Sequence, residues 1–205
     1  VDDPISSLDY TYESAVICRL AEAAKHRQVI VFTHRISMCV GLKEAADKNK
    51  VKYSEQRISG RGAEKGVPIP SASYGGKVVG NLNNLLNTNI AKIKKMDVND
   101  PEYDEKVHYV CQQIRIIVEK CVEEVLLNGV VVRFRRNIKT LGVIDKLADI
   151  SKDDCALIDR LMTKYSYYDH SMADDTPLQE FPIDEIEKDA LDLKDWAVMK
   201  QKQQR

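Results

Sequence analysis

The sequence predicts an α/β segment followed by a mainly α-helical domain, and three observations support this division. Residues 1–60 alternate helix-like and strand-like apolar patterns, residues 59–80 are rich in Gly, Pro and Ser, and the residues after them have helical apolar spacing. Helices that alternate with short apolar runs are typical of a parallel sheet covered by helices. We therefore expect an α/β part over 1–60, a loop or short hairpin over 61–80 and a helical domain over 81–205.

The first part is expected to follow the order helix, strand, helix, strand. Apolar residues fall on one face of a predicted helix over about 12–26, for which Asp9 or Thr11 is the expected cap. The run 28–33, QVIVFT, is apolar, β-branched and bounded by charge, as in a strand buried on both faces of a parallel sheet. A second helix is predicted around 36–46 and an alternating strand over 51–58.

The second part is expected to be mostly helical, because its apolar residues recur with helical spacing. Gly129 suits the end of the longest of these helices. The predicted helical segments cover about 82–93, 103–128, 130–149, 153–165 and 184–200.

Composition limits the class of protein. The chain has 205 residues, 43% of them hydrophobic, and a net charge of −1, so a nucleic-acid surface would have to be a local patch. Its five cysteines form no C-x-x-C pair, which argues against a disulfide framework or a zinc site. The sequence shows no signal peptide and no apolar run long enough to cross a membrane. We expect a cytoplasmic protein without a membrane partner.

The clearest candidate site joins residues 2–9, DDPISSLD, to the end of the run 28–33. Asp2 and Asp3 follow an apolar residue, and His34 follows the predicted strand. Ligands of open α/β sheets bind at the carboxyl ends of strands. Carboxylates suit a Mg²⁺ ligand and a base for water, and an imidazole can donate a hydrogen bond to a phosphoryl oxygen. An ordinary turn with a helix cap remains the alternative for residues 2–9.

This series resembles the Walker B, D-loop and H-loop motifs of ABC-type ATPases, a class that includes SMC-like DNA-repair ATPases. The resemblance implies that Asp2 holds Mg²⁺ and that Asp3 is the catalytic base, in a position where the family usually has glutamate. It implies that His34 is the switch histidine that contacts the γ-phosphate. The implied D-loop, which reaches across a head-to-head homodimer, contains Ser6, Ser7 and Asp9.

The wording DDPISSLD and the stretch 27–35, RQVIVFTHR, are most similar to bacterial phage-defence ATPases of the anticodon-nuclease type, the PrrC and RloC class. DNA or tRNA would then be the nucleic-acid partner. The sequence contains no G-x-x-x-x-G-K-[ST] loop, and Gly75-Gly76-Lys77 is followed by Val78. We therefore expect an upstream ATPase half to supply the loop that binds ATP, and we expect this chain alone to be inactive.

An alternative function assigns the helical part to RNA cleavage. Arg115, Glu119 and the distant His170 resemble the catalytic set proposed for anticodon nucleases and for helical RNases of the HEPN class. They would supply the cation, base and acid that metal-free RNA cleavage needs. HEPN enzymes usually have an arginine where this chain has Lys164. An Arg and a Glu four residues apart are also commonly a surface pair.

A basic cluster in the second part is a further candidate. It could bind phosphates or be a solvated face, and it consists of Arg133, Arg135, Arg136 and Lys139. A third hypothesis makes the whole helical part an interaction module without chemistry.

Overall fold

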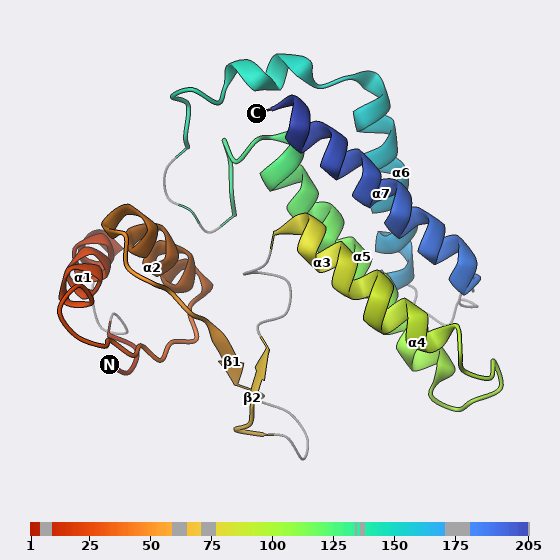
Figure 1. Ribbon diagram of the computed structural model, residues 1–205, viewed down its shortest axis with the longest axis horizontal. Coiled ribbons are helices and arrows are strands. Elements are labelled where there is room, and N and C mark those ends of the chain that lie inside the picture. Colours follow the sequence, from red (N-terminus) through yellow and green to blue (C-terminus); the bar gives the residue numbers. More distant parts are fainter. Residues whose placement is uncertain are drawn as a thin grey trace. The chain divides into compact units, whose positions relative to one another are not determined.

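A computed structural model describes residues 1–4, 10–58, 65–70, 77–133, 135, 138–170 and 181–204. The chain forms two units. The N-terminal unit contains Val1–Pro70 and Val132–Ile138, and the helical unit contains Ser71–Val131 and Lys139–Arg205. Figure 1 shows the elements of both in chain order. The return of Val132–Ile138 to the N-terminal unit, here called the return segment, has no signal in the apolar pattern of the sequence.

Two helices make up most of the N-terminal unit. They are α1 (Tyr10–Ala23) and α2 (Ile36–Asn49), which pack against each other (Figure 1). Gly41 allows this close approach, because a Cβ atom there would lie 2.6 Å from Ile17 Cδ1. The buried residues that the two helices share are Ile17, Ala21, Met38 and Ala45. The predicted helices are thus present, and Lys50 ends α2 in the left-handed conformation with φ of 56°.

The strands are shorter than the sequence predicts. β1 (Gln56–Ile58) pairs in antiparallel fashion with β2 (Pro68–Pro70). The run 28–33 forms one isolated parallel bridge, between Phe32 and Asp2, in the part of the chain that is described. Its Ile30 and Phe32 are 56% and 53% exposed, so these residues are not buried as expected. The run 28–33 pairs along one edge with residues 1–3. Two such short paired segments do not bury the apolar side chains of the run.

The helical unit begins with a continuous helical stretch. It consists of α3 (Val78–Asn84), the π-helix η2 (Leu85–Ile90) and α4 (Ala91–Ile93). The longest apolar stripe of the sequence forms α5 (Tyr103–Cys121), which the π-helix η3 (Val122–Leu126) continues. The remaining elements are the 3₁₀ helix η4 (Asp145–Asp149), α6 (Lys152–His170) and α7 (Ile183–Gln203).

The core of the helical unit lies between α3 to α5, α6 and α7 (Figure 1). The apolar stripe predicted for the longest helix is confirmed: Val122 is partly buried, and its other members, Val107, Val110, Cys111, Ile114, Val118, Cys121 and Val125, are buried. Each large apolar side chain of this kind stabilises the fold by about 1.5–3 kcal/mol when it leaves water. None of the helices in the described residues has the length and apolar character that crossing a bilayer demands.

The region between α5 and α6 is less helical than predicted. Of residues 130–149, the described part has helical structure over Asp145–Asp149 alone. Gly129 and Gly142 adopt positive φ angles of 66° and 71°, which interrupt a regular helix. The last two predicted helices are confirmed, and α6 continues five residues beyond the expected end at residue 165.

Candidate functional site

The two segments that carry the candidate ATPase residues lie side by side as short parallel partners. Val1 N donates to Ile30 O at 2.7 Å, and Phe32 N–H donates to Val1 O at 2.9 Å. Asp3 N–H then donates to Phe32 O at 2.7 Å. These hydrogen bonds bring residues at the start of the chain to the end of the run 28–33. They set the register that places Asp3 beside Thr33 and His34, the two residues after Phe32.

Both oxygens of the Asp3 carboxylate have a partner from that second segment. His34 Nδ1 lies 2.8 Å from Asp3 Oδ2, and the Thr33 hydroxyl donates to Asp3 Oδ1 at 2.9 Å. The Asp3 side chain is 19% exposed, whereas that of His34 is 82% exposed. The structure therefore brings together the two residues to which the resemblance assigns catalytic roles. It holds the carboxylate partly out of water and leaves most of the imidazole open to a ligand.

The chemistry of this pair is that of a carboxylate base beside a hydrogen-bond donor. Asp3 can accept a proton, and the imidazole can donate from both ring nitrogens when it is protonated. With Nδ1 directed at Asp3, the Nε2 atom of His34 lies on the side of the ring away from that carboxylate. A carboxylate and an imidazole at adjacent points can act as a base and a hydrogen-bond donor.

Asp2 is the candidate metal ligand. Its side chain is exposed, and its backbone forms the parallel bridge with Phe32. In the described residues, no group of three His, Cys, Asp or Glu side chains converges to hold a metal by itself. Mg²⁺ is commonly held by one or two carboxylates together with substrate phosphates and water, so an exposed single carboxylate fits this chemistry. The expected D-loop residues Ser6, Ser7 and Asp9 lie outside the described residues.

The alternative RNase residues are divided between two helices. Arg115 Nε lies 3.6 Å from Glu119 Oε1, and both belong to α5. His170 is the last residue of α6, which packs against α5 in the opposite direction (Figure 1).

The structure brings Arg115 and Glu119 together. The side chain of His170 lies outside the part of the chain that the structure describes, so no contact between it and this pair is assigned.

The basic cluster is not a single exposed patch. Arg135, in the return segment, has a side chain only 7% exposed, and its Nε lies 3.9 Å from Glu44 Oε1 of α2. Arg133 and Lys139 are exposed, whereas Arg136 lies outside the described residues. A buried arginine paired with a carboxylate is not available to bind a phosphate. Among the described members, Arg135 therefore has a structural role in the N-terminal unit.

Two buried aspartates of the helical unit were not found from the sequence. Asp189 on α7 accepts hydrogen bonds from Arg160 and Lys164, both at 2.6 Å, and from the Tyr165 hydroxyl at 3.0 Å. Burial by itself raises the pKa of Asp189, but these three hydrogen bonds lower it overall. Lys164, which occupies the position of the HEPN arginine, also binds Glu185 at 2.6 Å. The group joins α6 to α7.

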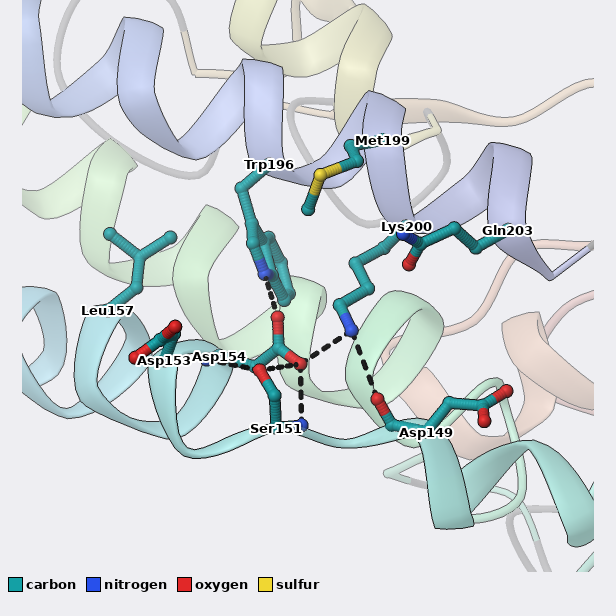
Figure 2. Close-up of a pocket in the computed structure, with 9 residues that line it drawn as sticks. All are labelled: Asp149, Ser151, Asp153, Asp154, Leu157, Trp196, Met199, Lys200 and Gln203. Carbon is teal, nitrogen blue, oxygen red and sulfur yellow. Dashed lines mark hydrogen bonds and ion pairs between the residues drawn. The ribbon is translucent and has the colours of Figure 1, made fainter.

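Asp154 is the second buried aspartate and adjoins a surface depression of about 710 Å³ (Figure 2). Ser151 and Asp154 hydrogen-bond each other's backbone N–H groups at 3.2 and 2.8 Å and form a capping box at the start of α6. Lys200 and Trp196 of α7 reach the same carboxylate. The pattern Ser-x-x-Asp at residues 151–154 could have predicted this cap from the sequence. Because its polar groups bind one another, we read this cluster as structural.

Comparison of the chain with protein-family models, with curated proteins and with solved structures finds no match. The geometry of Asp3 and His34 is therefore the observation on which a functional assignment depends.

Proposed function

We propose that the chain is the C-terminal portion of an ABC/SMC-like ATPase, which binds and hydrolyses ATP when an upstream half supplies the P-loop. The observation that carries this proposal is the 2.8 Å contact between His34 and Asp3. The two residues follow neighbouring parallel segments, and ligands of α/β sheets bind at this position. An ordinary turn over residues 2–9 does not by itself account for the two hydrogen-bonding contacts that Thr33 and His34 make with Asp3.

Each residue has one role in the proposed site. Asp2 holds Mg²⁺ together with the nucleotide phosphates, and the metal neutralises charge that develops on their oxygens. Asp3 orients the attacking water and accepts its proton. His34 keeps Nδ1 on Asp3 and presents Nε2 to the γ-phosphate. The base is one methylene shorter than the glutamate usual in the resembled family, so the water must lie closer to the segment that carries Asp3.

The biological setting follows the same resemblance and is proposed with it. Two such heads would pair around ATP, with Ser6, Ser7 and Asp9 reaching the opposite head. The process would be bacterial defence or the processing of DNA or tRNA in the cytoplasm. Five cysteines that are all free agree with a reducing compartment.

The test compares this chain with the same chain joined to the sequence that precedes Val1 in its gene. We expect the longer protein to hydrolyse ATP with Mg²⁺ and the chain alone to be inactive. Asp3→Asn and His34→Ala should each lower turnover by about 10² to 10⁴-fold, the usual contribution of a positioned base or donor. Asp47→Asn and His26→Ala are matched controls at exposed positions and should have no effect.

Two results would contradict the proposal. One is a preceding sequence without a P-loop. The other is Mg²⁺-dependent ATP hydrolysis by the chain alone that Asp3→Ala abolishes, because the chain itself would then contain a complete nucleotide site.

A further inference from the structure

The hydroxyl group of Thr33 makes two hydrogen bonds beside the candidate catalytic pair. It donates to Asp3 Oδ1 at 2.9 Å and accepts from the N–H of Arg35 at 3.1 Å. The other oxygen of Asp3 is held by His34 at 2.8 Å. Thr33 and His34, which are consecutive in the sequence, therefore each bind one of the two carboxylate oxygens of Asp3.

A carboxylate bound through one oxygen can still rotate, because the last torsion of an aspartate side chain is broad. A second hydrogen bond on the other oxygen fixes the plane of the group. Asp3 has a backbone φ of 35°, which residues other than glycine rarely adopt, so its Cβ direction is already unusual. The backbone thus sets the direction of the Asp3 side chain. The hydrogen bond from the Thr33 hydroxyl then selects one rotation of its carboxylate and so fixes the positions of Oδ1 and Oδ2.

We infer that Thr33 is a positioning residue, whose hydroxyl orients the Asp3 carboxylate toward His34 and toward the water that Asp3 activates. This inference rests on the proposed ATPase function, and it assigns Thr33 no contact with the nucleotide. The Arg35 N–H donates to the hydroxyl oxygen of Thr33, which leaves the hydroxyl proton of Thr33 to point at Asp3. Thr33 thereby links the entry of α2 to the orientation of the base.

A purely structural role for the same hydroxyl makes a different prediction. The side chain of Arg35, the N-cap residue of α2, does not cap the helix, so the Thr33 hydroxyl could serve only to accept a hydrogen bond from the Arg35 N–H. Its loss would then lower stability and leave catalysis by the folded protein unchanged. Thr33→Val removes the hydroxyl while keeping the shape, and Thr33→Ser keeps the hydroxyl, so the two variants separate these roles.

The kinetic test uses the protein with its upstream half. We expect Thr33→Val to lower kcat for ATP by about 10- to 100-fold with little change in KM, because a misplaced base slows the chemical step without removing a contact to ATP. Thr33→Ser should restore most of the rate. Thr163→Val, at an exposed position of α6, is the matched control and should leave both constants unchanged. A Thr33→Val enzyme with the wild-type kcat would overturn the inference.

A second readout does not depend on ATP hydrolysis, so that failure of the proposed function can be told from failure of this inference. The full chain is labelled with ¹⁵N-histidine, and the His34 imidazole signals are identified by their loss in His34→Gln. We expect Thr33→Val to shift the Nδ1 signal, since the carboxylate facing it rotates, and Thr33→Ser to leave it in place. An unshifted signal in Thr33→Val overturns the positioning role. A wild-type enzyme without turnover overturns the proposed ATPase alone.

Discussion

Trp196 donates its indole N–H to Asp154, with 2.7 Å between Nε1 and the carboxylate oxygen. The donor belongs to α7 and the acceptor to the first turn of α6. Lys200, one turn beyond Trp196, lies 2.5 Å from the other oxygen of Asp154 and also donates to Asp149 O at 3.1 Å (Figure 2). One buried carboxylate thus fastens the start of α6 to α7.

Loss of this carboxylate should destabilise the helical unit. Asp154→Ala leaves the indole N–H and the nearly buried Lys200 ammonium without their main acceptor, and it removes the cap of α6. We expect the free energy of unfolding to fall by about 3–5 kcal/mol, as for a broken buried ion pair. Urea unfolding followed by Trp196 fluorescence measures it, because Trp196 is the single tryptophan of the chain.

The matched control is Asp153→Ala, the exposed aspartate beside it. It removes a charge from the same helix turn, so it should cost about 1 kcal/mol or less. Equal losses for the two variants would contradict the role assigned to Asp154.

Acid should weaken the helical unit through the same aspartate and through Asp189. Burial raises the pKa of each carboxyl, and their hydrogen bonds more than offset it, so both pKa values lie below the usual range. The unfolded chain then binds more protons than the folded chain as the pH falls. The stabilisation is complete above about pH 5, and it is lost as the pH drops through about 4 toward the lowered folded values.

Urea titrations at pH 7 and pH 3.5 measure this loss. The double variant Asp154→Asn and Asp189→Asn should lose less of its free energy of unfolding between the two pH values than the wild type does, because it lacks both shifted groups. If the loss is the same in both proteins, other carboxyl groups cause the acid sensitivity.

The two cations on Asp189 should differ in their contribution to stability. Lys164 and Arg160 are both 2.6 Å from the carboxylate, but the Lys164 side chain is 11% exposed and that of Arg160 is 49% exposed. An exposed ion pair is worth about 1 kcal/mol or less, whereas a buried one costs several when one partner is removed. We expect Lys164→Met to lower the free energy of unfolding by about 2–3 kcal/mol and Arg160→Met by about 1 kcal/mol or less. The reverse order in chemical denaturation would show that exposure does not decide the difference.

The helices were predictable because apolar spacing alone specifies them. Val110, Ile114, Val118 and Cys121 lie on one face of any helix that contains them, and burial follows wherever that face meets another element. The π-helical turns η2 and η3 have no such signal. They add one residue per turn inside an apolar pattern that an α-helix would satisfy almost as well.

The contacts of single polar residues were not predictable in the same way. Asp189 and Asp192 are three residues apart in α7, yet Asp189 is buried under three donors and Asp192 is exposed. Their difference depends on the packing of α6 against α7, which the local sequence does not encode. Asp3 and His34 could be paired in advance because the resemblance placed both at one site, whereas Thr33 is identified by its hydrogen bond to Asp3 in the structure.

The position of Arg115 and Glu119 within one helix gives a prediction for the alternative RNase function. The two residues share one turn of α5, where they form an ion pair at 3.6 Å, and His170 ends a different helix, α6. Metal-free RNA cleavage needs its acid and its base within hydrogen-bond reach of a single phosphodiester. We therefore expect that His170→Ala and Glu119→Gln will not change cleavage of tRNA by the protein joined to its upstream half. End-labelled tRNA resolved on a denaturing gel measures this, with His26→Ala as the control. Loss of a wild-type cut in both variants would show that these residues act together and that the helical part is the nuclease.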